Sequence, residues 1–122
     1  MPATLYGLNN CDTCRKARRL LDSLGVDYAF VDLRAEASDS DGKLDKTLVD
    51  WFFDHAQWDT LINRRSTTWG QLDQQQRDTL NADSARSLAI TYPTLLKRPL
   101  LVTGEQLLVG FDQHAYEQFA QH

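Results

Sequence analysis

Two cysteines, Cys11 and Cys14, lie near the start of the chain in the segment "NNCDTCRKARRLL". A cysteine thiolate is both a nucleophile and a metal ligand, and two cysteines can also form a disulfide. With two residues between them, the sulfurs come within reach of each other when the segment is helical. The motif is therefore consistent with a reactive pair, with part of a metal site or with a structural disulfide.

The metal and structural alternatives fit the rest of the sequence less well. A closed zinc site takes four ligands, and His55, His114 and His122 lie far from the cysteines without ligand spacing. Two cysteines cannot form the disulfide framework of a small secreted protein, and 122 residues can bury a core without one. We therefore expect a reactive pair and no metal, with two isolated thiols of no redox role as the alternative.

The elements around the cysteines favour redox chemistry. The apolar segment 4–8 predicts a strand, and residues 11–25 predict a helix with Gly25 as its C-terminal stop. Cys11 would lie at the helix N-terminus, where free backbone N–H groups and the helix dipole stabilise a thiolate. A mixed disulfide formed on Cys11 could then be resolved by Cys14 or by a small external thiol.

Four basic residues follow directly on the same predicted helix, Arg15, Lys16, Arg18 and Arg19. Their side chains point in different directions around the helix. We expect one or two of them to approach Cys11 and the others to form a solvated face.

The remaining segments complete an α/β pattern. We predict a second strand at 26–34, helices at 44–56, 58–63, 66–81 and 82–93, a hairpin at 98–111 with Gly104 in its turn, and a terminal helix at 112–122 whose inward-facing candidates are Ala115, Phe119 and, third, Tyr116. Ser66 or Thr67, Asp83 or Ser84, and Asp112 are the expected helix caps. The order predicts one domain over residues 1–122, with a helical insertion at about 40–92.

Composition limits the environment and the partners. No apolar run reaches the roughly 20 residues of a membrane span, and the N-terminal segment lacks the pattern of a signal peptide. The net charge of −4 gives no general electrostatic case for binding nucleic acid. We expect a cytoplasmic protein with no membrane contact and no direct nucleic-acid contact.

Three segments, taken in order, resemble one known family. "YGLNNCDTCRKARRLL", "LINRRSTTWGQL" and the late pair "KRPLL" and "LLVGF" are similar to the arsenate reductase (ArsC)-related family, in particular its YffB branch, and also to the Spx redox regulators. The resemblance covers nearly the whole chain. It implies a thioredoxin-like, glutaredoxin-related fold with a mixed sheet, and a cis peptide bond before Pro99.

The resemblance also implies roles for individual residues. The nucleophile of the family falls on Cys11, the arginine before the proline on Arg98, and a further arginine position on Arg65, with Arg64 its less certain neighbour. These arginines are implied to bind an oxyanion or the carboxylates of a glutathione-like thiol, because guanidinium groups match both. The function implied is a glutathione-dependent thiol reductase with no bound cofactor and with glutathione as co-substrate.

Two departures from the family pattern bear on the function. Arsenate reductases of this type carry a third arginine near the last hairpin strand, where this chain reads "LLVGFD", so arsenate is the less favoured substrate. Cys14 is a second cysteine, as in the Spx switch. The alternative is therefore an Spx-like redox regulator that binds the RNA polymerase α subunit.

Overall fold

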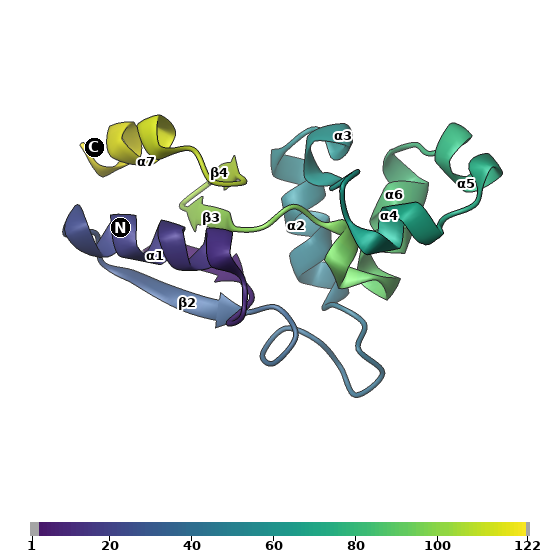
Figure 1. The fold of residues 1–122 in the computed structure, drawn as a ribbon, viewed down its shortest axis with the longest axis horizontal. Coiled ribbons are helices and arrows are strands. Elements are labelled where there is room, and N and C mark those ends of the chain that lie inside the picture. Colours follow the sequence, from purple (N-terminus) through teal and green to yellow (C-terminus); the bar gives the residue numbers. More distant parts are fainter. Residues whose placement is uncertain (1–2, 122) are drawn as a thin grey trace. The chain divides into compact units, whose positions relative to one another are not determined.

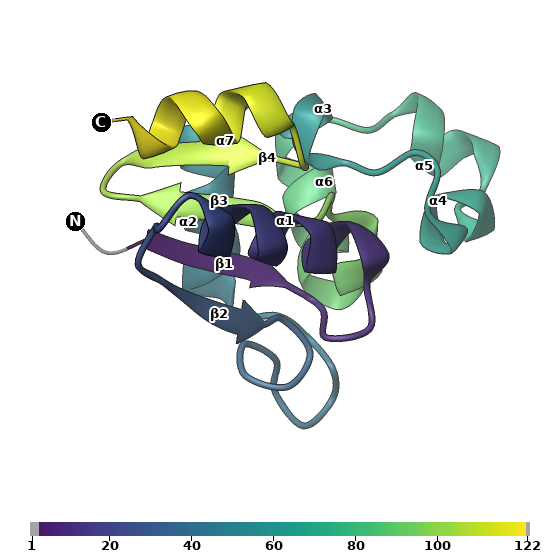
Figure 2. The same cartoon turned by 60° about the vertical axis from the view of Figure 1, so that its left-hand side comes forward.

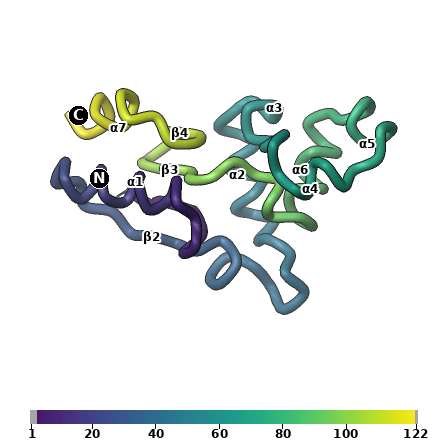
Figure 3. The backbone as a smooth tube through the Cα atoms, viewed as in Figure 1, coloured from purple at the N-terminus to yellow at the C-terminus, as the bar shows by residue number. Residues whose placement is uncertain are grey.

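The computed structural model describes residues 3–121, and the chain divides into two units. The first unit takes in the described residues up to Leu33 together with those from Arg98 onward. The second unit is the intervening segment Arg34–Lys97. The trace in Figure 3 shows the chain leaving the first unit after its second strand and returning to it at the third.

The first unit is built on a four-stranded mixed sheet in the order β2-β1-β3-β4. Its strands are β1 (Ala3–Gly7), β2 (Tyr28–Asp32), β3 (Leu100–Thr103) and β4 (Gln106–Val109). β1 pairs in parallel with β2 and antiparallel with β3, which forms the predicted hairpin with β4. Because β1 and β2 run in parallel, their carboxyl ends, Gly7 and Asp32, meet at one edge of the sheet.

Helix α1 (Asp12–Ser23) connects the two parallel strands. Its buried positions, Cys14, Ala17 and Leu21, recur at helical spacing. The helix ends at Ser23 with Leu24 as its C-cap, and Gly25 follows with a φ of 72° that suits glycine. Gly25 N–H donates to the Asp22 carbonyl and Val26 N–H to the Leu21 carbonyl. The predicted stop at Gly25 is confirmed.

Helix α7 (Gln113–Ala120) follows the hairpin and is capped by Asp112, as predicted. The last residue of the predicted helix, His122, lies outside the described residues. α7 contacts α1, and both pack on the sheet (Figures 1 and 2). The core between them contains Ala3, Leu5, Ala17, Leu21, Leu101 and Tyr116.

The second unit is helical. It comprises α2 (Lys46–His55), α3 (Trp58–Leu61), α4 (Thr67–Gln71), α5 (Gln74–Asp78), α6 (Ala82–Thr91) and the short 3-10 helix η1 (Pro93–Leu95). Ile62, Leu72, Ala85 and Leu95 form its buried cluster.

Two details of the second unit differ from the sequence prediction. The predicted continuous helix at 66–81 is wrong, because Leu72 is extended and Asp73 starts a new helix through a reciprocal capping box with Gln76. The predicted caps Asp83 and Ser84 are also wrong, since Asn81 caps α6 and Ser84 is its partner in a second capping box. Ser66 caps α4 as expected.

The first unit as a whole has the topology expected of a thioredoxin-like fold, a strand–helix–strand unit followed by a hairpin and a terminal helix. The α/β class with a mixed sheet is confirmed. Among the described residues, no helix combines the length and the apolar character needed to cross a membrane.

Candidate functional site

Cys11 ends the loop that leads from the carboxyl end of β1 into α1, and Cys14 lies in the first turn of α1. That loop is held by the buried carboxylate of Asp32, which accepts a hydrogen bond from the Asn9 N–H at 2.9 Å. The neighbouring Leu33 N–H donates to the Gly7 carbonyl at 2.8 Å. The end of β2 therefore fixes the backbone that presents Cys11.

Cys11 is the N-cap residue of α1. Its backbone is extended, with φ −110° and ψ 121°, and its carbonyl accepts the helical hydrogen bond from the Arg15 N–H at 3.0 Å. Its sulfur accepts a hydrogen bond from the Cys14 N–H at 3.4 Å, as the side-chain oxygen of an N-cap serine or aspartate usually does. The sulfur is thus placed at the positive end of the helix dipole, as the sequence predicts.

The surroundings of Cys11 lower the pKa of its thiol. Partial burial acts in the opposite direction, but hydrogen bonds from the side chain and backbone of Cys14, the charge of Arg98 and a hydrogen bond from the Thr13 backbone outweigh it. Each of these interactions favours the thiolate. Since Cys11 is also partly exposed, it is the thiol better prepared to react with a substrate.

Cys14 has the opposite character. Its side chain is fully buried, and burial raises the pKa of its thiol to about 11, helped by the hydrogen bond to Cys11 and opposed by one from the Leu8 backbone. The two sulfurs are not joined in a disulfide in this structure. The pair therefore consists of one accessible thiol that ionises readily and one buried thiol that holds its proton.

The basic residues that follow the cysteines interact mainly with other groups. Arg15 forms an ion pair with Asp12, and Arg18 places its guanidinium 4.2 Å from the centroid of the Phe30 ring. Lys16 and Arg19 are exposed. The arginine whose charge lowers the pKa of Cys11 is Arg98, so the expectation that one or two of the four approach Cys11 is not supported.

Arg98 and Pro99 belong to the same unit as the cysteines. The peptide bond between them is cis, which confirms the expectation for Pro99. Pro99 is buried directly before β3, and its carbonyl accepts a hydrogen bond from the Gly110 N–H at 2.8 Å. Arg98 is half-buried, and its charge acts on both cysteine thiols.

Arg64 and Arg65 belong to the second unit. Both side chains are exposed, and the Arg65 N–H donates to Oδ1 of Asn63 at 3.0 Å. The Arg64 guanidinium lies 5.3 Å from the centroid of the Trp69 ring and donates to the Asp59 carbonyl at 3.4 Å. The first unit therefore contains four of the predicted site residues, Cys11, Cys14, Arg98 and Pro99. Arg64 and Arg65 have the local contacts given above, within the second unit.

The sequence analysis did not identify three residues that influence the two cysteines. Asp32 anchors the loop, Gly7 packs against the sulfur of Cys14, and Tyr116 interacts electrostatically with Cys14. Asp32 could have been found from its place at the end of the second predicted strand. The other two depend on packing that no local sequence pattern reveals.

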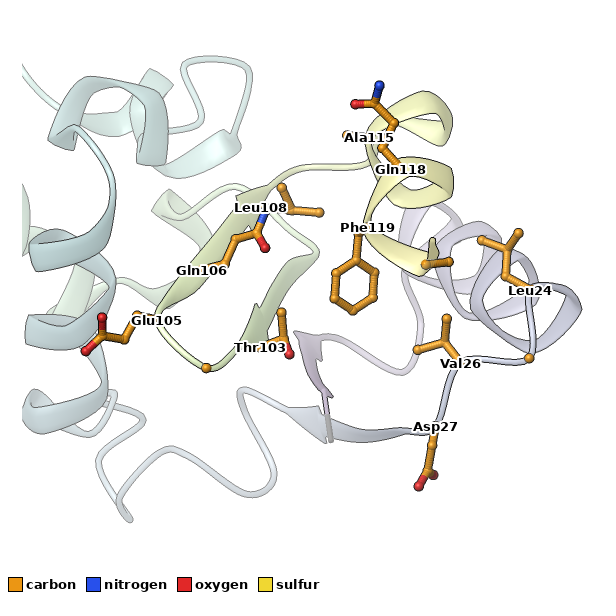
Figure 4. Close-up of a pocket in the computed structure, with 13 residues that line it drawn as sticks. Leu24, Val26, Asp27, Thr103, Glu105, Gln106, Leu108, Ala115, Gln118 and Phe119 are labelled. Atoms are coloured by element: carbon orange, nitrogen blue, oxygen red, sulfur yellow. The ribbon is translucent and has the colours of Figure 1, made fainter. Parts of the chain in front are cut away.

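A cavity of about 1010 Å³ lies at the opposite end of the sheet from Cys11, between the start of β2, the β3–β4 turn and α7. Figure 4 shows the Phe119 ring directed into it, between Leu108 and Val26, while the carboxylates of Asp27 and Glu105 point away. Neither cysteine lines it. Within residues 3–121, no group of three or more His, Cys, Asp or Glu side chains is arranged to hold a metal ion.

The model of the ArsC family matches residues 6–119 of the chain. Among solved structures, the chain is similar to a YffB protein, with 36% identity, a TM-score of 0.83 and coverage of 95% of this chain and 96% of the other. It is also similar to an arsenate reductase (ArsC) related protein from Brucella melitensis, with 38% identity, a TM-score of 0.76 and coverage of 98% and 94%.

A third relative is a regulator. The global transcriptional regulator Spx of Listeria monocytogenes is 28% identical over 95% of this chain and 85% of its own length. The sequences similar to this chain therefore include both arsenate reductase-related proteins and transcriptional regulators.

Proposed function

Since this chain belongs to the ArsC family, we propose that it is a thiol-dependent oxidoreductase that uses glutathione as its co-substrate. Cys11 is the nucleophile and Cys14 the resolving thiol. The observation that carries the proposal is the position of the Cys11 sulfur, which caps α1, accepts the Cys14 N–H and is influenced by the charge of Arg98.

The reaction follows from the difference between the two thiols. The Cys11 thiolate attacks one sulfur of a disulfide, forms a mixed disulfide and releases the other sulfur as a thiolate, which takes up a proton. Cys14 then attacks Cys11 and releases the bound thiol, or glutathione does so in its place. Glutathione returns the protein to the dithiol state in the cytoplasm, where we place this activity because thiols are kept reduced there.

The arginines are proposed to bind anionic groups of the substrate. Arg98 is half-buried near both cysteines, and its planar guanidinium can donate two parallel hydrogen bonds to a carboxylate of glutathione. Pro99 follows it after a cis peptide bond and directly precedes β3. The role of Arg65 in binding, with Arg64 as its neighbour, rests on the match to the family motif.

Mass spectrometry after incubation with oxidised glutathione tests the assignment. The wild-type chain should lose two hydrogens as Cys11 and Cys14 form a disulfide. Cys14→Ser should retain one glutathione on Cys11, and Cys11→Ser should remain largely unmodified because Cys14 is buried and protonated. Modification of Cys14 in the Cys11→Ser variant at the wild-type rate would reverse the two roles.

The second candidate function is an Spx-like redox regulator that binds the RNA polymerase α subunit. The Spx relatives and the presence of Cys14 beside Cys11 favour it. Pull-down of the α subunit with the reduced and the oxidised chain separates the candidates, since binding that changes with oxidation supports the regulator and failure to bind in both states supports the enzyme.

Arsenate is the less favoured substrate, because "LLVGFD" contains no arginine. We expect little arsenate turnover with glutathione and glutaredoxin.

A further inference from the structure

The cavity at the end of the sheet opposite Cys11 lies wholly within the first unit. Its volume of about 1010 Å³ is at the upper end of the range found for sites that bind organic molecules. The proposed redox reaction does not involve this space, since neither cysteine lines it. Its apolar wall consists of Leu24, Val26, Leu108, Ala115, Phe119 and Ala120.

The apolar wall is held in place by the core of the first unit. Val26, Leu108 and Phe119 pack against the buried core cluster of that unit. Figure 4 shows the Phe119 ring directed into the cavity between the other two side chains. A wall fixed by core packing does not have to be ordered by the ligand, which lowers the cost of binding. The interior of the cavity therefore suits the apolar body of an organic molecule.

The charges at the cavity are negative. Among the described residues that line it, Asp27 and Glu105 are the charged ones, and none is basic. Both side chains are exposed, and neither forms an ion pair within residues 3–121. Their carboxylates point away from the interior (Figure 4). A cation paired with them would therefore stay hydrated at the rim while an apolar body attached to it entered the cavity.

The register of the sheet separates the two carboxylates. Tyr28 and Thr103 pair with Ala3 from opposite sides. Their Cα atoms are therefore about 10 Å apart, which is two interstrand spacings. Asp27 directly precedes Tyr28, and Glu105 follows Thr103 in the β3–β4 turn. The two carboxylates are thus carried on either side of β1, at the same end of the sheet.

We propose that this cavity binds an elongated organic dication, with an apolar body and a positively charged nitrogen at each end. The body lies along the apolar wall, and the charged ends reach Asp27 and Glu105 at the rim. The same carboxylates repel anions, so glutathione, the proposed co-substrate of Cys11, is not the ligand of this cavity. The site goes beyond the proposed function and does not depend on it.

An NMR titration of the isotope-labelled chain with diaminooctane tests the site, with the backbone amide shifts of Val26, Leu108 and Phe119 as the readout. Four further probes each change one property of diaminooctane. Octylamine keeps the carbon chain and loses one charge, octanediol loses both charges, and suberate replaces both with carboxylates. Diaminobutane keeps both charges on a chain too short to connect the two carboxylates across the apolar wall.

We expect saturable shifts at the three residues with diaminooctane and none with suberate. Octylamine and diaminobutane should each bind about two- to fivefold more weakly than diaminooctane, because one exposed ion pair is lost. Asp27→Asn and Glu105→Gln should each lower the affinity for diaminooctane by the same factor and leave that for octanediol unchanged. Asp22→Asn is the matched control, because Asp22 is exposed in the same unit but does not line the cavity. It should alter neither affinity.

Three results would overturn the inference. The first is the absence of saturable shifts at the lining residues with diaminooctane, or shifts centred on Cys11 instead. The second is binding of suberate as tight as that of diaminooctane. The third is an unchanged affinity for diaminooctane in the double variant Asp27→Asn/Glu105→Gln. The reaction of Cys11 with oxidised glutathione is measured separately, so each of these results leaves the proposed function standing.

Discussion

The backbone N–H of Cys14 donates a hydrogen bond to the sulfur of Cys11 across 3.4 Å. This bond closes the first turn of α1, so the reactive sulfur is also the cap of the helix that carries its partner. A thiolate accepts such a bond better than a thiol does, and the helix dipole adds to the preference. Helix capping and activation of Cys11 therefore depend on the same interaction.

The first prediction concerns the pH dependence of Cys11. Its pKa is lowered in the folded protein, and the thiolate is the reactive form. The rate of alkylation should therefore be at its plateau above that pKa and fall as the pH falls through it. In Cys14→Ser, iodoacetamide alkylation followed against pH should give a midpoint below that of an unfolded cysteine peptide. A midpoint equal to the peptide's would contradict the activation of Cys11.

Arg98 should carry part of this activation, because its charge lowers the pKa of Cys11. Arg98→Gln should move the alkylation midpoint to higher pH and reduce the rate at neutral pH severalfold. Arg98→Lys keeps the charge but loses the planar guanidinium, so it should retain more of the alkylation rate than of the affinity for glutathione. Equal midpoints in the wild type and Arg98→Gln would exclude Arg98 as an activating group.

Helices and strands that depend on local residue patterns were predicted correctly from the sequence. The predictions were wrong or incomplete where tertiary packing determines the structure. The helix after Cys11 follows from apolar spacing and from the stop at Gly25, both of which are local. The cis bond before Pro99 was expected only through the family resemblance. The break at Leu72 was missed because its apolar side chain fitted the helical period, although Asp73 and Gln76 have the spacing of a capping box.

The same distinction between local patterns and tertiary packing applies to the residues of the site. The position of Cys11 at the helix start was predicted from the sequence alone, because a strand and a helix of recognisable pattern flank it. The relation between Tyr116 and Cys14 was not, since it depends on how α7 packs against α1. The basic residues after Cys14 were misleading for a physical reason, because Arg15 and Arg18 have partners of their own on Asp12 and Phe30.

Arg65 is the residue whose proposed role depends most on the family motif. If it binds a carboxylate of glutathione, Arg65→Gln should raise the KM for glutathione by about 10- to 100-fold, as expected for loss of a charged hydrogen bond. Cys11 alkylation by the neutral reagent iodoacetamide should be unchanged. Arg64→Gln is the control, because Arg64 already contacts Trp69 and the Asp59 carbonyl. An equal rise in both variants would indicate a general effect of charge.

Asp32 should stabilise the loop before Cys11 through its hydrogen bond to the Asn9 N–H. Asp32→Ala leaves that N–H without its acceptor and should lower the free energy of unfolding by about 1–3 kcal/mol. Asp32→Asn keeps an oxygen acceptor and should lose less. Urea unfolding monitored by circular dichroism measures both changes. Equal losses in the two variants would show that the carboxylate charge, rather than this hydrogen bond, is responsible.

The last prediction concerns Gly7 and the space around Cys14. A Cβ atom at Gly7 would lie 2.7 Å from the Cys14 sulfur and 3.3 Å from both Cβ of Cys14 and Cε1 of Phe30. The sulfur has no exposed surface to move into, so Gly7→Ala forces either Cys14 or β1 to shift. Overpacking of this kind should lower the free energy of unfolding by about 1–3 kcal/mol.

Gly70→Ala provides the matched control for this substitution. Gly70 lies in α4, and a Cβ atom added there would meet no heavy atom within 4 Å. Because alanine favours a helix more than glycine does, this variant should be neutral or more stable by up to about 1 kcal/mol. Gly7→Ala should also slow formation of the Cys11–Cys14 disulfide with oxidised glutathione, which Gly70→Ala should leave unchanged. If Gly7→Ala is as stable and as fast as the wild type, Cys14 has freedom to move and its confinement does not control the resolving step.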